Sequence, residues 1–281
     1  MRFRKIYIEI SNLCNLRCSF CPGTKRAPRR MRVEEFSALM PKLQPYTEYL
    51  YFHLMGEPLC HPQLLELLTI AGAHGFRVII TTNGTLLADR GQELLLSPAL
   101  HKVNISLHAF EANDIAISFD EYLRSCFSFG KRAEGEKLIV YRLWNQGGLE
   151  ARNREILTQM RAYFPEPWAV EHRGTRIGER VYLEYGDKFE WPDLSAQEGS
   201  REVFCYALRD QLGILCDGTV VPCCLDHEGD LALGNLFTQD LESILTSNRA
   251  KAIYEGFSNG CAVETLCRRC GYSRRFRKEK T

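Results

Sequence analysis

The chain has 281 residues, of which 45% are apolar, 25% charged and 11% aromatic, and its formal net charge is +1. These fractions are typical of a folded protein with one large and one small domain, and the balanced charge argues against a nucleic-acid binder. No apolar run approaches the roughly 18 residues that cross a bilayer, and the N-terminal MRFRKIYIEIS lacks the apolar core of a signal peptide. We therefore expect no membrane association and a cytoplasmic location.

The first 170 residues alternate strand-like and helix-like segments. Runs rich in β-branched and aromatic residues predict strands at 5–10, 48–54, 76–82, 102–108 and 137–144, with a sixth strand near 166–172. Segments between them with apolar residues at helical spacing predict helices at 33–43, 62–75, 85–95, 118–132 and 149–164. Such alternation predicts an α/β fold with a parallel sheet and right-handed crossovers. About six units fall short of an eight-fold barrel, so we predict a partial (β/α)6 TIM-like barrel.

The pattern changes towards the C-terminus. Residues 171–200 are interpreted as a last strand and a linker, and LGILCDGTVVPCC predicts a hairpin that turns at Asp217-Gly218. DLESILTSNRAKAIYEGF predicts a single helix over 240–257, followed by a cysteine-rich end. We therefore predict a barrel domain at 1–195 and a small cysteine-rich domain at 196–281, a size at which bound metal often supplements a limited core.

The twelve cysteines are the unusual feature of the composition. In a long chain without an export signal, clustered cysteines more often hold metal than form disulfides. Three lie within 14–21 and seven between 205 and 270, whereas Cys60 and Cys126 stand alone.

The first cluster of cysteines, CNLRCSFC, follows the first predicted strand. Cys14, Cys18 and Cys21 are spaced C-x3-C-x2-C. Three thiolates on one tight loop can hold three irons of a cubane 4Fe–4S cluster and leave the fourth iron open for a ligand. The alternatives are a three-cysteine zinc site or a chance grouping; zinc sites usually combine a C-x2-C pair with a second pair elsewhere.

This motif resembles that of the radical S-adenosylmethionine (SAM) superfamily. The resemblance implies that the amino and carboxylate groups of SAM chelate the open iron. It also implies that the reduced cluster cleaves SAM to a 5′-deoxyadenosyl radical, which abstracts hydrogen from unactivated carbon.

The resemblance also implies a SAM pocket at the carboxyl ends of the strands. Gly56-Glu57-Pro58 looks like the family's Gly-Glu motif that cradles the methionyl ammonium, with Met55 in place of the first of two glycines. Ser106 resembles the residue that bonds the carboxylate or ribose, and Arg142 could clamp the carboxylate. The expected cofactor-binding residues are Phe20, Gly56, Glu57, Pro58, Thr82, Asn83, Ser106 and Arg142. Alternatively, Thr82 and Ser106 are strand-end hydroxyls and Arg142 forms a structural ion pair.

The second cluster of cysteines resembles the reduced SPASM-type auxiliary domain, or twitch domain, of certain radical SAM dehydrogenases. The resemblance implies one further 4Fe–4S cluster with Cys205, Cys223, Cys267 and Cys270 as its ligands. Cys216, Cys224 and Cys261 remain spare, and Cys224 or Cys261 is the alternative ligand. A four-cysteine zinc site is the competing interpretation.

A fully ligated second cluster can transfer electrons but cannot bind substrate, and this favours an oxidation. We expect the enzyme to abstract hydrogen from a small molecule or peptide and to pass a second electron to the auxiliary cluster, while a base takes the proton. Asp226 and His108 are the candidate catalytic bases, with Glu171 as a further candidate, and His53 and His61 are interpreted as packing or supporting residues.

Two other functions remain open. One is a radical SAM enzyme that modifies RNA or protein and uses the second cluster only for structure; the other is a non-catalytic iron–sulfur or zinc protein. The leading interpretation implies a flavodoxin- or ferredoxin-type electron donor as a partner. It makes a membrane or nucleic-acid partner improbable.

Overall fold

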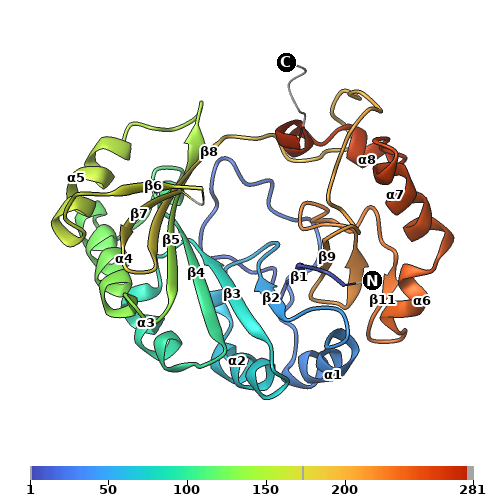
Figure 1. Ribbon diagram of the computed structural model, residues 1–281, viewed down its shortest axis with the longest axis horizontal. Coiled ribbons are helices and arrows are strands. Elements are labelled where there is room, and N and C mark those ends of the chain that lie inside the picture. Colours follow the sequence, from blue (N-terminus) through green and yellow to red (C-terminus); the bar gives the residue numbers. More distant parts are fainter. Residues whose placement is uncertain (1, 173, 277–281) are drawn as a thin grey trace.

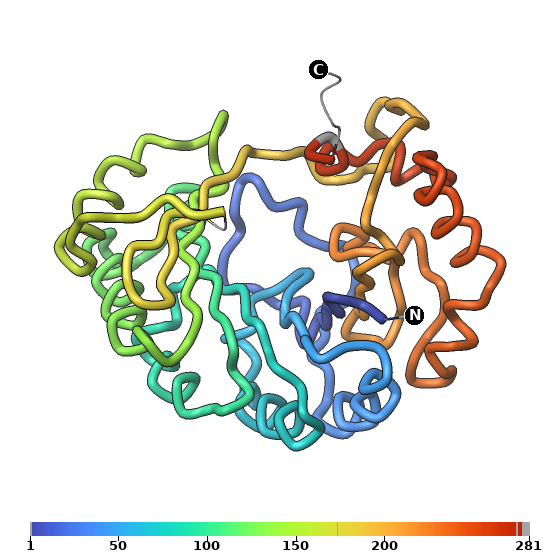
Figure 2. The backbone as a smooth tube through the Cα atoms, in the orientation of Figure 1, coloured from blue at the N-terminus to red at the C-terminus, as the bar shows by residue number. Residues whose placement is uncertain are grey.

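The computed structural model describes residues 2–172 and 174–276. Their strands form one curved sheet in the order β11-β10-β9-β1-β2-β3-β4-β5-β8-β7-β6. Figure 1 shows this sheet bent into an incomplete ring, and Figure 2 traces the segment that follows β8 across the open side towards the C-terminal part. The expected partial barrel is therefore present.

Six strands of the ring run parallel in register, and helices connect them. The strands are β1 (Lys5–Ile8), β2 (Tyr49–Phe52), β3 (Arg77–Thr82), β4 (Leu100–Ser106), β5 (Leu138–Gln146) and β8 (Val181–Asp187). The helices are α1 (Val33–Leu43), α2 (Leu64–Ala73), α3 (Leu87–Leu96), α4 (Phe119–Ala133) and α5 (Asn153–Tyr163). These helices lie on the outer side of the sheet in Figure 1, as the crossover rule requires.

The predicted position of the sixth parallel strand is wrong. Residues 166–172 contain β6 (Ala169–Glu171), which pairs antiparallel with β7 (Gly174–Gly178) at the edge of the sheet. The sixth parallel strand is β8, within the segment interpreted as a last strand and linker. The physical difference is burial: Val170 in β6 is 88% exposed, whereas Val181 and Leu183 in β8 are buried.

The C-terminal part extends the same sheet at its other edge. β9 (Gln211–Ile214) pairs parallel with β1, and β10 (Thr219–Val221) pairs antiparallel with β9. β11 (Gly234–Asn235) pairs with β10. The predicted hairpin at Asp217-Gly218 is thus confirmed, and the domain limits 1–195 and 196–281 stay a prediction.

The single helix expected over 240–257 is two helices. α6 (Leu241–Leu245) ends before Ser247, whose hydroxyl accepts a hydrogen bond from the backbone of Ala250 and caps α7 (Asn248–Ser258). α8 (Thr265–Arg268) and two short 3₁₀ helices, η1 (Pro58–Cys60) and η2 (Leu107–Ala109), complete the elements used below. None of the helices in the described part of the chain combines the length and hydrophobicity of a bilayer-spanning helix.

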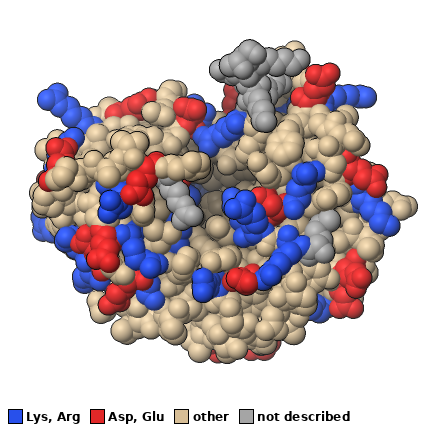
Figure 3. All heavy atoms as spheres, viewed as in Figure 1, with Lys and Arg blue, Asp and Glu red and all other residues tan. Residues whose placement is uncertain are grey.

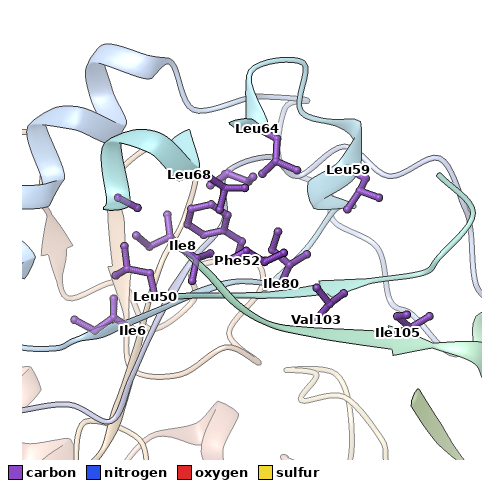
Figure 4. Packing of buried hydrophobic residues seen from close by; sticks show 14 of the residues in the cluster. Ile6, Ile8, Leu50, Phe52, Leu59, Leu64, Leu68, Ile80, Val103 and Ile105 are labelled. Carbon is purple, nitrogen blue, oxygen red and sulfur yellow. The ribbon is translucent and has the colours of Figure 1, made fainter. Parts of the chain in front are cut away.

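The core lies between the sheet and the outer helices. Side chains at alternate strand positions, among them Ile6, Ile8, Leu50 and Phe52, are fully buried and pack against helix residues such as Leu68, as Figure 4 shows. Because side chains alternate along a strand, the intervening positions face the inside of the ring. There the sequence places polar and aromatic groups.

Candidate functional site

The three-cysteine loop begins directly after β1. Cys14, Cys18 and Cys21 are free thiols at or near the surface, and the backbone N–H of Cys21 donates to the carbonyl of Cys18. The side-chain amide of Asn113 donates to the Cys18 sulfur at 3.1 Å, and the N–H of Leu16 lies 3.4 Å from the Cys14 sulfur.

These donors matter because partial burial alone disfavours thiolates: it raises the pKa of Cys14 to about 12. N–H groups aimed at sulfur, and thiols that ionise only beside a bound cation, are what an iron–sulfur cluster requires. The loop residues therefore fit such a cluster. Asn113, 95 positions from Cys18, has no local sequence signal that links it to the loop.

The Gly56–Glu57 turn packs directly against the cysteine loop. Gly56 has φ +76°, and a Cβ there would lie 2.2 Å from the carbonyl oxygen of Ser11 and 2.8 Å from that of Leu13. The N–H of Glu57 donates to the same Leu13 carbonyl at 2.8 Å. Glycine is therefore required at position 56 because the turn approaches the backbone of the cysteine loop closely. This contact holds the loop over the end of β2.

Glu57 is buried and joins the ends of β2 and β3. Its carboxylate accepts hydrogen bonds from the backbone N–H of Leu59 at 3.1 Å and of Asn83 at 2.7 Å. Burial raises the pKa of the Glu57 carboxyl to about 7. Pro58 is buried at the start of η1, and the Thr82 hydroxyl accepts a hydrogen bond from Gly84.

Asn83 connects this turn to the cysteine loop. Its side-chain amide donates to the Asn15 side chain at 2.9 Å and lies 3.9 Å from the Cys14 sulfur. The structure therefore brings Glu57, Thr82 and Asn83 together beside the first cysteine.

Ser106 and Arg142 stand opposite each other in the register of β4 and β5. Arg142 forms a 2.9 Å ion pair with Glu184, its register partner on β8, and its guanidinium lies 4.5 Å from the ring centre of Trp144. Arg142 therefore forms an ion pair in this structure, as the alternative interpretation expected.

Phe20 and His108 meet at the rim above these residues. Their ring centres are 5.1 Å apart, and with Trp144 and Lys188 they line a cavity of about 150 Å³ beside the cysteine loop. His108 Nδ1 lies 3.1 Å from the carbonyl oxygen of Arg142. Burial lowers the pKa of the His108 imidazole to about 4.

A second group of cysteines surrounds a cavity of about 300 Å³ next to β1. The cavity wall includes the four predicted auxiliary ligands, Cys205, Cys223, Cys267 and Cys270. Burial, followed by the proximity of the other thiols, raises the pKa of Cys205 to about 12 and that of Cys223 well above its ordinary value. Thiols in such surroundings ionise when they bind metal, so the donor set fits an iron–sulfur cluster.

The three spare cysteines lie at different places relative to the auxiliary cavity. Cys224 lines the same cavity and forms a side-chain hydrogen bond with Tyr7 of β1. Cys216 is buried elsewhere, beside Glu9, and Cys261 is outside the cavity wall. In the described residues, no three His, Cys, Asp or Glu side chains converge tightly enough for a single metal ion.

The predicted bases Asp226 and Glu171 do not lie together with His108. Asp226 lines the auxiliary cavity, where its carboxylate accepts backbone hydrogen bonds from Asp230 and Leu231, both at 2.9 Å. Burial raises the pKa of Asp226 to about 6. Glu171 lies at the far edge of the sheet in an ion pair with Arg176, away from both cysteine groups.

The ring of strands also encloses an open cavity of about 760 Å³. It is lined at the amino ends of the strands by Lys5, Tyr49 and Lys102, and deeper by Tyr51 and Glu184. Figure 3 shows the molecule hollowed at the centre of the ring, with charged side chains of both signs around the opening. The sequence patterns did not indicate this opening.

Comparisons with known proteins agree with this arrangement. A protein from Pyrococcus furiosus described as a tungsten-containing aldehyde ferredoxin oxidoreductase cofactor-modifying protein is 28% identical over 142 residues, which are 49% of this chain and 38% of the relative. A GTP 3′,8-cyclase from Chlorobaculum tepidum is 36% identical over 110 residues, 38% of this chain and 33% of the relative. The match therefore spans about a third of the length of these curated relatives.

Solved structures with low sequence identity share the fold over nearly the whole chain. BtrN in complex with AdoMet and 2-DOIA has a TM-score of 0.63 at 18% identity, with 96% of this chain and 93% of that chain covered. anSMEcpe with bound AdoMet has a TM-score of 0.64 at 15% identity, with 100% and 92% covered. Streptococcus suis SuiB bound to precursor peptide SuiA has a TM-score of 0.63 at 16% identity, with 96% and 70% covered.

Two family models match the chain itself. The model of the radical SAM superfamily matches residues 8–130, which include the three-cysteine loop and the Gly56–Glu57 turn. The model described as SPASM, an iron–sulfur cluster-binding domain, matches residues 205–271, which contain all four cysteines predicted to hold the second cluster. The chain belongs to the radical SAM superfamily and carries a C-terminal SPASM iron–sulfur domain.

Proposed function

We propose that this radical SAM enzyme carries out a two-electron oxidation of a small molecule or a peptide, with the auxiliary cluster as the acceptor of one electron. The observation that carries the proposal is the position of the auxiliary cavity beside β1, the strand whose carboxyl end leads into the three-cysteine loop: Tyr7 of β1 lines the auxiliary cavity and contacts Tyr51 inside the ring. A redox centre this close to the first cluster site can receive an electron from a substrate radical formed there.

In this proposal Cys14, Cys18 and Cys21 hold the SAM-binding 4Fe–4S cluster, and Asn113 stabilises the Cys18 thiolate through its amide. When bound, the reduced cluster and SAM supply a 5′-deoxyadenosyl radical. Glu57 and Asn83 hold the loop in place, because their hydrogen bonds join the ends of β2 and β3 to it.

The proposed SAM pocket lies along the carboxyl ends of β2 to β5. One side of the pocket is formed by Glu57, Thr82 and Asn83, and the other side by Ser106 and Arg142. The ring of Phe20 covers the pocket. The proximity of these groups to the cysteine loop supports the assignment. Because Arg142 is paired with Glu184, it would bind a carboxylate only with its remaining N–H groups.

The second 4Fe–4S cluster is proposed to be held by Cys205, Cys223, Cys267 and Cys270. Four thiols in the wall of one cavity of about 300 Å³ suit a cluster of several atoms better than one zinc ion, for which no three ligand side chains converge in the described residues. Cys224, which is hydrogen-bonded to Tyr7, is then a neighbour of the cluster and not a ligand.

Solved structures of the same fold support both proposed substrate classes, the small molecule and the peptide. One solved structure of this fold contains 2-DOIA and another contains a precursor peptide. A flavodoxin- or ferredoxin-type donor would reduce the first cluster, and oxygen-sensitive clusters would suit the cytoplasm.

The first test is anaerobic. The reconstituted protein, reduced with Ti(III) citrate and given SAM together with a small-molecule and peptide extract of its own cells, should form 5′-deoxyadenosine and a product lighter by two hydrogens. A C14A variant should form neither. The proposal would be overturned if C14A still formed 5′-deoxyadenosine and the lighter product, or if the intact protein formed no 5′-deoxyadenosine.

Variants C267A and C270A distinguish oxidation from a structural role of the second cluster. The oxidation proposal expects 5′-deoxyadenosine to continue while the lighter product disappears. A C216S variant is the matched control, since Cys216 is buried outside the cavity, and its iron content should equal that of the intact protein. Full product formation by C267A would instead favour a purely structural cluster.

A further inference from the structure

His53 lies inside the ring, immediately after β2. Residues 50 and 52 of this strand point into the core, so alternation places Tyr51 on the inner side of the ring, and the contact of His53 with Tyr7 places His53 on the same side. The imidazole is half-buried, and its ring centre is 6.0 Å from that of Tyr7 on β1. Tyr7 lines the auxiliary cavity and is hydrogen-bonded to Cys224.

This position lies between the two redox sites. Glu57, four residues further along the chain, binds the end of β3 beside Cys14, while Tyr7 contacts the auxiliary side. A substrate that receives a radical from one site and delivers an electron to the other must lie between them, on the side of the ring where His53 lies.

The ring nitrogens of His53 are free to act on a ligand. Neither of them makes a hydrogen bond with any residue in the described ranges 2–172 and 174–276. Burial, and next the positive charge of Arg142, lower the pKa of the His53 imidazole to about 4. The side chain is therefore neutral near pH 7 and has an available lone pair.

The two bases expected from the sequence are engaged elsewhere. Asp226 uses its carboxylate oxygens to accept two backbone hydrogen bonds, and His108 Nδ1 is within hydrogen-bond distance of the Arg142 carbonyl. His108 also packs against Phe20, at a tilted angle, beside the cysteine loop. Of these groups, His53 lies inside the ring, against Tyr7, and neither of its ring nitrogens is hydrogen-bonded to a described residue, whereas one nitrogen of His108 is held by the Arg142 carbonyl.

We propose that His53 is the catalytic base that accepts the proton during oxidation of the substrate radical. The inference rests on the proposed function. One C–H bond breaks as the deoxyadenosyl radical takes its hydrogen atom. The resulting substrate radical then loses one electron to the auxiliary cluster and one proton, from a neighbouring O–H, N–H or C–H bond, to the imidazole. The substrate thereby loses two hydrogens, and the two redox sites balance the electrons.

The test compares H53Q and H53A with the intact enzyme, using the cell extract and Ti(III) citrate described above. General-base catalysis contributes roughly 100-fold or more, so we expect at least that loss of the lighter product with 5′-deoxyadenosine formation retained. Electron paramagnetic resonance of freeze-quenched samples should then show an accumulated organic radical. Added imidazole should restore product in H53A and remove that radical.

H74Q is the matched control, because His74 lies at the C-terminal end of the outer helix α2, away from the inside of the ring. It should form product at the rate of the intact enzyme. If H53A loses iron, H53Q decides the question, because glutamine keeps the size and polarity of the side chain but cannot accept a proton.

The outcomes separate the two proposals. If the intact enzyme forms no lighter product, both are overturned. If it does, and H53Q matches it, only the role of His53 is overturned. Loss of 5′-deoxyadenosine in H53Q with both clusters intact would make His53 a binding residue and would also overturn its role as base.

Discussion

Glu9 and Arg26 form an ion pair of 2.6 Å, with the Glu9 side chain fully buried and the Arg26 side chain 15% exposed. The second oxygen of Glu9 accepts the backbone N–H of Cys216, and Arg26 Nε donates to the carbonyl of His227. One buried carboxylate therefore joins the end of β1, the loop after the three cysteines and the SPASM domain. The Glu9–Arg26 ion pair therefore links the loop of the first three cysteines to the SPASM domain.

Replacing Glu9 with glutamine should destabilise the protein by about 3 kcal/mol, because it leaves Arg26 without its buried counter-charge. The midpoint of anaerobic urea unfolding, followed by circular dichroism, measures the change. E155Q is the control: Glu155 pairs with Arg152 on the surface, where such pairs contribute below about 1 kcal/mol. Equal midpoints for E9Q and E155Q would show that the buried pair does not stabilise the fold.

Replacing Gly56 with alanine should prevent the cysteine loop from docking. The added Cβ would meet two backbone carbonyl oxygens, which cannot move aside as a flexible side chain can. We expect the iron content per protein after reconstitution to fall by about half or more, with a cost well above the ~1 kcal/mol of a strained φ alone.

G147A provides the matched comparison for that variant. Gly147 also has a positive φ, of +75°, but a Cβ there would meet nothing within 4 Å. It should therefore keep its iron. If G56A and G147A bind equal iron, the close approach of the turn to the loop is not what positions the cysteines.

The sequence predicts those parts of this structure that depend on local pattern. Runs of β-branched and aromatic residues, together with apolar residues at helical spacing, predict the five βα units, and the distribution of cysteines predicts both cysteine groups. The sequence pattern wrongly assigns the sixth parallel strand to 166–172 and not to VYLEYGD, because the choice between the two segments depends on burial, and burial depends on the partners that the fold supplies. That error also hid Glu184, the partner of Arg142, since the pair follows from the register of β5 and β8.

Other features have no local signal at all. The pairing of β9 with β1 joins segments about 200 residues apart, and nothing in either strand specifies the other. The role of His53 depends likewise on what surrounds it: the same residue would be a packing group if a neighbour bonded its ring nitrogens. Residue type suggests chemistry, but only the fold decides which groups remain free.

Replacing Asn113 with aspartate should weaken the first cluster while leaving the loop folded. Aspartate keeps the oxygen that accepts the Arg17 N–H at 2.8 Å, but it loses the N–H groups that donate to the Cys18 sulfur and to the Ala109 carbonyl, and it adds a negative charge there. Because such partners commonly change metal affinity by 10–100-fold, we expect iron loss to a chelator to be roughly 10-fold faster. N153D, at an amide that bonds Asn145 away from the cysteines, should lose iron at the normal rate.

Replacing Glu57 with glutamine should change how stability depends on pH. Burial raises the pKa of this carboxyl from 4.5 to about 7, so the folded protein holds the proton more tightly than the unfolded chain does. Stability from this group is therefore full below pH 4.5 and declines as the pH rises through about 7, by on the order of 3 kcal/mol. Glutamine cannot ionise, so E57Q should lack this decline.

Urea unfolding at pH 5, 6, 7 and 8 measures the difference between E57Q and the intact protein. E57Q should gain relative stability as the pH rises, whereas parallel curves would mean that the buried carboxyl does not titrate in this range. If Glu57 binds the ammonium of SAM, as the resemblance to the family implies, the cation lowers the pKa of the carboxyl. Saturating SAM should then flatten the decline in the intact protein and leave the E57Q curve unchanged in shape.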